Sequence, residues 1–130
     1  MRVEACFTVT GEGLEFSVIE EATCLEPTDV WRVGEAVGFT QLCRKCDGWR
    51  YAVSHEDNVD ASAVMASVVD RLSPACESIR LLGERGWHSE VSCVVYTSGQ
   101  MPVLNFKPCT ISSIARLGAS LDIDIILSAS

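Results

Sequence analysis

Alternation of apolar and polar residues at the two ends of the chain constrains the fold more than any other feature of the sequence. Near the N-terminus the apolar positions are Val3, Ala5, Phe7 and Val9. Near the C-terminus they are Leu121, Ile123, Ile125 and Leu127. Successive side chains of a strand point to opposite faces of its sheet, so residues 2–10 and 121–127 are each predicted to form a half-buried β-strand.

Between these strands the apolar spacing changes to that of a helix. One stripe of apolar residues predicts a helix with a buried side, made of Val64, Met65, Val68, Val69 and Leu72. The side chains of residues 57–60 offer several N-caps for it. Ser73-Pro74 predicts a bend, with serine as a new N-cap and proline at the first helical position, before the helix resumes to Leu82.

Two shorter helices are also predicted. Ser17 and Glu20 have the spacing of a capping box, in which each side chain accepts a hydrogen bond from a free N–H at the helix start. They indicate a helix over 18–24. Thr110 is predicted to cap another helix, which ends at Gly118.

Two predicted hairpins complete the elements. Residues 37–42 and 49–54 suit strands, and Asp47-Gly48 is a turn signal because glycine accepts a positive φ. The sequence CRKCDG, residues 43–48, is therefore placed at the tip of the first hairpin. Residues 89–97 and 102–106 are predicted to form the second hairpin, with its turn at Ser98-Gly99.

The predicted order is β-α-β-β-α-β-β-α-β in one domain of residues 1–130. This is an α+β fold, in which a ferredoxin-like β-α-β-β-α-β core is extended by a C-terminal β-α-β. Its helices are expected on one face of a mixed, mostly antiparallel sheet. A chain of this length buries enough surface to form a core without a metal or disulfide.

Composition limits the classes of partner. The formal net charge is −8, from 18 acidic and 10 basic side chains, and a field of this sign repels the phosphates of nucleic acids. No apolar run approaches the roughly 20 residues that span a bilayer, and the N-terminus lacks the apolar core of a signal peptide. We therefore expect a cytoplasmic protein without membrane contact. The seven cysteines are an odd number and are expected to stay reduced.

Several short motifs in the chain together resemble one bacterial family. They are TGEGLE at 10–15, LEPT at 25–28, WRVGE at 31–35, Gly48-Trp49, and LGASLDIDI at 117–125. The sequence is similar in these motifs to the domains of unknown function numbered 4279. The resemblance covers nearly the whole chain and implies an α+β domain without an established enzymatic activity. It implies no catalytic residues, and the cysteine-bearing segment 43–48 fits its pattern least clearly.

Cys43 and Cys46 are the first candidates for metal or thiol chemistry. Zinc needs about four ligands, and His55, Cys24 and Cys109 are conceivable additions, but none forms a second close pair. A thioredoxin-type pair would begin a helix, which a hairpin tip does not provide. The sequence therefore favours two thiols without a metal or cofactor, and the alternative is a metal site of Cys43, Cys46 and His55.

Each of the three tryptophans precedes a basic residue, in the pairs Trp31-Arg32, Trp49-Arg50 and Trp87-His88. On a strand, the ring can be buried while the basic neighbour faces solvent, and this structural interpretation is favoured. The functional interpretation makes the first two pairs candidate binding residues. Arginine can hold a carboxylate or phosphate with two parallel hydrogen bonds.

Asp122 and Asp124 share one face of the predicted last strand. Paired carboxylates can bind a cation or act as acid and base, and the two aspartates are therefore kept as candidate binding residues. The favoured interpretation is that they mark the solvent-facing side of the strand. They can also protect an exposed sheet edge against aggregation.

The sequence does not favour an enzyme, because it shows no Ser-His-Asp or Cys-His grouping and no phosphate-binding glycine loop. The leading hypothesis is a non-enzymatic interaction domain with a protein partner. Its most concrete version is an immunity-type protein that covers a basic partner such as a nuclease toxin. The alternatives are a small-ligand-binding regulatory domain and a thiol or metal protein that uses Cys43 and Cys46. A homodimer is left open.

Overall fold

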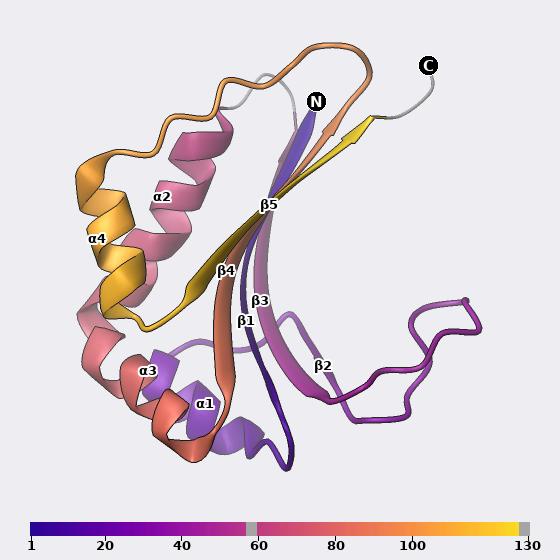
Figure 1. The fold of residues 1–130 in the computed structure, drawn as a ribbon, viewed down its shortest axis with the longest axis vertical. Coiled ribbons are helices and arrows are strands. Elements are labelled where there is room, and N and C mark those ends of the chain that lie inside the picture. The colour runs from indigo at the N-terminus through magenta and orange to yellow at the C-terminus, as the bar shows by residue number, and fades with distance from the viewer. Residues whose placement is uncertain (57–59, 128–130) are drawn as a thin grey trace.

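The computed structural model describes residues 1–56 and 60–127. Its elements in chain order are β1 (Arg2–Gly11), α1 (Phe16–Thr23), β2 (Asp29–Trp31), β3 (Asp47–Glu56), α2 (Ala61–Leu72), the 3-10 turn η1 (Ser73–Ala75), α3 (Cys76–Leu82), the 3-10 turn η2 (Gly83–Arg85), β4 (His88–Thr97), α4 (Pro108–Arg116) and β5 (Ser120–Leu127). The helices gather on one side of the sheet, and no described helix covers its other side (Figure 1). The α+β class is confirmed.

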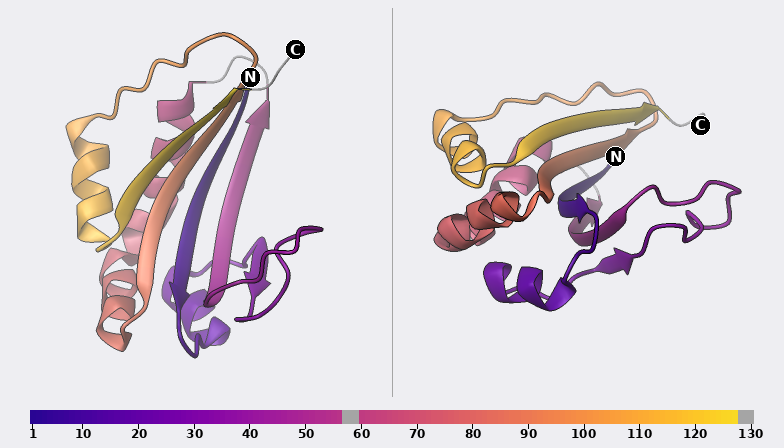
Figure 2. Two further views of the ribbon diagram at one scale, coloured as in Figure 1. Left: turned by 45° about the vertical axis from the view of Figure 1, so that its right-hand side comes forward. Right: turned by 60° about the horizontal axis from the view of Figure 1, so that its bottom comes forward.

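The described strands form one twisted sheet in the order β2-β3-β1-β4-β5 (Figure 2). β1 pairs antiparallel with both β3 and β4, and β2 pairs antiparallel with β3. β5 alone is parallel to its neighbour β4, and α4 lies in the crossover that a parallel connection requires. The sheet is therefore mixed and mostly antiparallel, as predicted, and β1 is its central strand.

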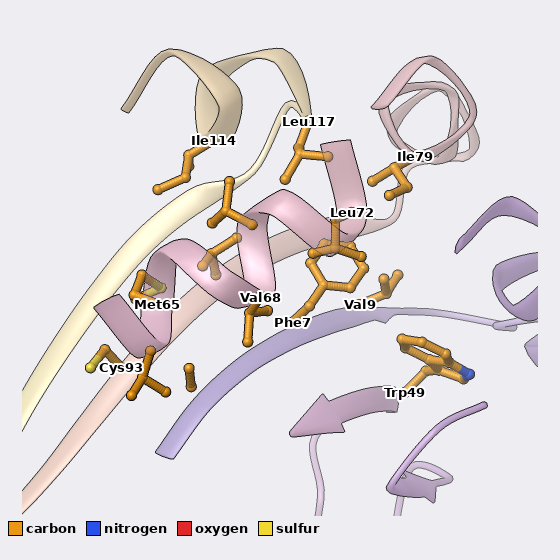
Figure 3. Close-up of a cluster of buried hydrophobic side chains, with 14 of the residues drawn as sticks. Phe7, Val9, Trp49, Met65, Val68, Leu72, Ile79, Cys93, Ile114 and Leu117 are labelled. Atoms are coloured by element: carbon orange, nitrogen blue, oxygen red, sulfur yellow. The ribbon is translucent and has the colours of Figure 1, made fainter. Parts of the chain in front are cut away.

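The core lies between the sheet and the helices. The alternating apolar residues of β1 and the predicted apolar stripe of α2 both belong to this core. Phe7 of β1 packs beneath Val68 and Leu72 of α2 (Figure 3). Trp49 is fully buried and meets Phe7 edge to face, with ring centroids 6.3 Å apart. Burial of each large apolar side chain stabilises the fold by roughly 1.5–3 kcal/mol, which makes this layer the main source of stability.

The long helical segment bends where the sequence predicted. Pro74 lies in η1, directly after α2, and since it has no N–H it cannot continue the α-helical pattern by donating to the Asp70 carbonyl. The prediction of Ser73 as a new N-cap is wrong. Its backbone is helical, and its hydroxyl donates back to the carbonyl of Val69 at 2.9 Å.

Two other predicted caps are wrong for a common reason, because each helix begins before the predicted cap. α1 starts at Phe16 with Glu15 as N-cap, which places Ser17 inside the helix. α4 starts at Pro108 with Lys107 as N-cap, which places Thr110 in its first turn. The prediction for α2 is confirmed at Asp60, whose Oδ1 accepts a hydrogen bond from the Ser62 amide at 2.9 Å; candidates 57–59 lie outside the described residues.

Two predicted strands are absent from the described part of the chain. Residues 37–42 lie outside the sheet, because β2 occupies the outer edge of β3 at residues 48–50. Residues 102–106 are extended but do not pair in the sheet. Leu104 and Phe106 pack against the core, while the amide of Asn105 donates to the Ser62 hydroxyl at 2.8 Å. The alternation of apolar and polar residues in 102–106 therefore reflects packing over α2 and not a hairpin strand.

Candidate functional site

The uncovered side of the sheet is a broad exposed surface, and we call it the open face. It carries the strand residues that alternate with Val3, Ala5 and Phe7 and whose side chains point away from the helices. Its acidic side chains are Glu4, Asp29, Glu56, Glu90, Asp122 and Asp124. Its arginines are Arg2 and Arg50. Acidic side chains therefore outnumber the arginines on this face.

Both arginines of the open face are already engaged. Arg2 stacks over the ring of Tyr96, with 4.2 Å from Cζ to the ring centroid. Arg50 donates from Nη2 to Oδ2 of Asp29 at 3.0 Å. Of the six acidic side chains of the open face, only Asp29 makes an ion pair among the described residues, so the carboxylates of β4 and β5 are uncompensated, as are Glu4 and Glu56. Of the predicted binding pair on β3, Arg50 lies on the open face, whereas Trp49 lies in the core.

Asp122 and Asp124 lie side by side on β5, which is an outer strand of the sheet. In register they stand opposite Ser92 and Val94, and both are exposed. The structure thus places the two aspartates on the solvent side of an edge strand, as the sequence predicted. Described residues contain no group of three or more His, Cys, Asp or Glu side chains that could hold a metal ion.

Trp31 lies at one end of the open face, within β2. It pairs with Gly48 across the strands, and its ring lies flat over that glycine. A Cβ built on Gly48 would come within 2.0 Å of the ring atoms Cε2 and Cζ2. Arg44 stacks on the other side of the ring, 3.9 Å from Cζ to the centroid. The ring is therefore buried, in agreement with the structural interpretation.

The turn predicted at Asp47-Gly48 is wrong, because both residues begin β3. Gly48 is needed for the close approach of Trp31, not for a positive φ. Asp47 is buried and accepts hydrogen bonds from the amide of Val33 at 2.9 Å and from that of Leu14 at 3.1 Å. It thus fastens the start of β3 to two loops.

Arg32 is the third partner of Asp47. Its Nη1 donates to Asp47 Oδ2 and to the Leu14 carbonyl, both at 2.8 Å, and its Cζ lies 4.1 Å from the centroid of Phe16. Hydrogen bonds from the Val33 amide, from Arg32 and from the Leu14 amide hold the pKa of Asp47 below its ordinary value. The Arg32 guanidinium, a candidate ligand-binding group, therefore makes structural contacts within the protein.

Residues 32–46 leave the sheet between β2 and β3, and we call this segment the arm. It extends on the side away from the helices, next to the open face (Figure 1). It is itself a small hairpin. Gly34 donates to the Arg44 carbonyl at 2.9 Å, Arg44 donates to Glu35 at 2.7 Å, and Val37 donates to Leu42 at 2.9 Å.

The tip of the arm is apolar. Phe39 has no side-chain burial at all, with a relative exposure of 111%, and Leu42 is 69% exposed. Gly38 has φ +58, a conformation that favours glycine, and Thr40 closes the turn by donating to the Val37 carbonyl at 2.6 Å. A fixed backbone thus presents an aromatic ring to solvent, where a lone phenylalanine gains nothing for the fold.

The cysteine pair lies on the returning strand of the arm. Cys43 forms an isolated bridge with Ala36 and is exposed, while Cys46 is half-buried. The prediction that CRKCDG forms a hairpin tip is wrong, since the tip is at 38–41. His55 is exposed near the far end of β3, and the described structure shows no metal-binding group that includes it.

All seven cysteines are free thiols. Cys6 belongs to the open face but is only 3% exposed, and burial, followed by the nearby Glu4 carboxylate, raises its pKa to about 11. Burial also raises the pKa of Cys93 in the core. Both thiols are therefore protonated at neutral pH and behave as small apolar side chains.

The geometry defines an α+β domain with one face of its sheet open and acidic, flanked by an apolar-tipped arm. The chain belongs to the DUF4279 family, the domain of unknown function whose family model matches residues 1–128. Neither the curated proteins nor the solved structures contain a match to the chain. No described helix is long and apolar enough to cross a membrane.

Sequence reasoning missed three residues that shape this surface: Phe39, Arg44 and Asp47. The available signal for a turn at the arm tip was Gly38, the residue before Phe39, because glycine accepts the positive φ found there. Arg44 and Asp47 carry no local signal, because their partners Trp31 and Val33 lie more than ten residues earlier in the chain.

Proposed function

We propose that this domain is a non-enzymatic protein-binding module that covers a basic partner with its open face. The observation that carries the proposal is the row of uncompensated carboxylates on β4 and β5, at Glu90, Asp122 and Asp124. The chain as a whole is also negative, with a formal net charge of −8. Opposite charge on the partner would speed the encounter and fix its orientation.

The arm supplies what charge alone does not give, an apolar anchor. Interfaces draw most of their binding energy from a few aromatic or large side chains that enter pockets on the partner. Phe39 is such a side chain, and the cross-arm hydrogen bonds hold it ready, which reduces the conformational entropy lost on binding. The proposed partner therefore combines a basic surface with an apolar pocket at its border.

A basic enzyme that binds nucleic acid has such a surface around its active site. An immunity-type role, in which the domain covers a nuclease toxin, is the concrete form of this proposal. A reaction carried out by the domain itself is not part of the proposal, because the two thiols of the arm, one exposed and one half-buried, belong to no metal-binding group among the described residues. The cytoplasm, where the cysteines would stay reduced, is the proposed location.

For the fold we propose the ferredoxin-like plan. The order β2-β3-β1-β4, with every neighbouring pair antiparallel, supports this assignment, as does the position of α1 between β1 and β2 and of α2 between β3 and β4. β5 is then an addition at the β4 edge, reached through α4. This addition widens the open face and provides two of its carboxylates.

Affinity capture from the native cell with matched charge variants tests the proposed function. The triple variant Glu90→Lys, Asp122→Lys, Asp124→Lys reverses charge on the open face. The control Glu20→Lys, Glu21→Lys, Glu84→Lys makes the same change in net charge at exposed positions on the helical side. The wild type and the control should retain a basic protein, identified by mass spectrometry, that the open-face variant loses.

Kinetics with that purified partner provide the second test. The association rate should fall with rising salt, and Phe39→Ala should mainly speed dissociation, by roughly tenfold or more for an anchor residue. An acidic partner, or equal retention by the open-face variant, would show that the proposed function is wrong.

A further inference from the structure

A cavity separates α2 from the start of α4, on the opposite side of the sheet from the open face. Its volume is about 420 Å³, within the range of small-molecule sites. Ala66 and Phe106 give it apolar walls, and Asp70, Lys107 and Thr110 give it polar ones. Asp70 comes from α2 and Lys107 from the start of α4, so side chains of both charges line the cavity.

Thr110 carries the first argument for a ligand. The residue is only 7% exposed, yet its hydroxyl has no hydrogen-bond partner among the described residues. Two other buried or half-buried hydroxyls in helical segments bond back to the preceding turn, since Thr23 donates to Ile19 at 2.8 Å and Ser73 to Val69 at 2.9 Å. The Thr110 hydroxyl makes no such bond among the described residues, although its amide donates to the Lys107 carbonyl at 3.0 Å. A bound molecule would satisfy it.

The N-terminus of α4 carries the second argument. The N-cap Lys107 makes no side-chain cap, so the partial positive charge of this end is not neutralised by the protein. Lys107 also lines the cavity and makes no ion pair in the described structure. A helix N-terminus, an ammonium group and a hydroxyl around one cavity together suit a carboxylate.

Asp70 on α2 provides the opposite charge. It lines the same cavity, is exposed, and makes no ion pair with any described residue. A carboxylate in this position accepts hydrogen bonds from an ammonium group. A second acidic residue, Asp60, also lines the cavity but already accepts from the Ser62 amide. A simple anion would therefore meet net repulsion, whereas a zwitterion matches both poles.

We propose that the cavity between α2 and α4 binds a free α-amino acid with an apolar side chain. Its carboxylate would lie at the start of α4, near Thr110 and Lys107, and its ammonium group at Asp70. Its side chain would contact Ala66 and Phe106. This is a ligand site separate from the proposed protein interface, and it does not depend on that interface.

Thermal unfolding with defined ligands tests the proposal. L-Leucine, L-valine, L-methionine and L-phenylalanine are compared with two analogues of leucine, isoamylamine without the carboxylate and 4-methylpentanoate without the ammonium group. At least one amino acid should raise Tm in a saturable way at about 10 mM, well above the Kd of a millimolar ligand. Neither analogue should do so. No shift with any of the four, or an equal shift with either analogue, would overturn the proposal.

Variants assign the poles of the site. Thr110→Val and Asp70→Asn should each weaken binding of the same amino acid by roughly tenfold, the loss expected for one hydrogen bond to a charged group. The control Thr8→Val makes the same substitution on the open face and should leave affinity unchanged. Titration followed by amide chemical shifts gives a second readout, in which Ala66 and Thr110 should move. Unchanged affinity in both cavity variants would place the ligand elsewhere and contradict the assignment.

Discussion

Single residues set how closely the chain segments approach one another, and Gly48 shows this most sharply. The register places it opposite Trp31, whose ring occupies the space of a side chain. Glycine here is a packing requirement that no local pattern in the sequence reveals. The Asp47-Gly48 pair looked like a turn because aspartate and glycine are common in hairpin turns, whereas here aspartate accepts buried hydrogen bonds and glycine allows close packing.

Gly48→Ala should destabilise the protein by about 1–3 kcal/mol, because the new Cβ would overlap the indole and displace Trp31 and the stacked Arg44. Gly83→Ala is the matched control. Gly83 has φ −63 and no atom within 4 Å of the position that a Cβ would take, so the same substitution should be neutral or slightly stabilising there. Urea unfolding of both variants measures the difference. Equal stability of the two would refute this account of Gly48.

Asp47 makes stability depend on pH. Its pKa is lower in the folded protein, so the stabilisation is fully present above the unfolded value of about 3.9 and is lost as pH falls through the folded value. Asp47→Asn should therefore reduce stability at pH 7 and flatten the acid limb of the stability profile. Asp70→Asn removes the same charge from an exposed position and serves as control. Urea unfolding from pH 2 to 7 would contradict the account if the two profiles coincided.

At the scale of elements, the ends of helices depend on local hydrogen bonds. Asp60→Ala should cost about 0.5–2 kcal/mol, because it removes the acceptor of the Ser62 amide at the start of α2. Asp60→Asn keeps a capping oxygen and should recover most of this loss. Thermal and urea unfolding measure both variants, and an Asn variant as unstable as the Ala variant would argue against capping as the cause.

The elements that sequence reasoning located correctly are those with their own periodicity. The alternation of β1 and the stripe of α2 are consequences of which face is buried, and both are confirmed. β2 has three residues, too few for a pattern, and its place at the β3 edge depends on tertiary pairing. Residues 37–42 and 102–106 have strand-like composition, but the first turn back on themselves within the arm and the second pack over α2, so propensity alone misplaced them in the sheet.

The candidate site was predictable only in part. Asp122 and Asp124 were placed on the solvent side of the last strand by alternation, and the structure agrees. The burial of Trp31 and Trp49 was the favoured interpretation of their motifs and is confirmed. Sequence reasoning placed the helices on one face of the sheet, which implies an open face on the other, and the described helices agree (Figure 1). The arm beside the open face was not predicted, because it depends on the tertiary pairing of the short strand β2 with β3.

For the molecule as a whole, an open sheet has edges, and its outer strands must avoid pairing with other chains. β5 is such an edge, and Leu121, Ile126 and Leu127 on it are 43%, 39% and 65% exposed. Charged side chains are one means by which proteins prevent edge-to-edge association. The two aspartates of β5 thus have a role in the free protein, besides the one proposed for them in partner binding.

The double variant Asp122→Val, Asp124→Val should associate with itself more strongly than the wild type. It would turn β5 into an unbroken apolar strand of seven residues, the composition typical of segments that form intermolecular sheets. Sedimentation velocity over a range of concentrations should show larger species that the wild type lacks. Asp122→Asn, Asp124→Asn removes the charge but keeps the strand polar, and should give an intermediate result if both charge and polarity protect the edge. A valine variant that sediments like the wild type at every concentration would show that this edge is protected by its twist and by the parallel partner β4, and that the aspartates are retained for another purpose.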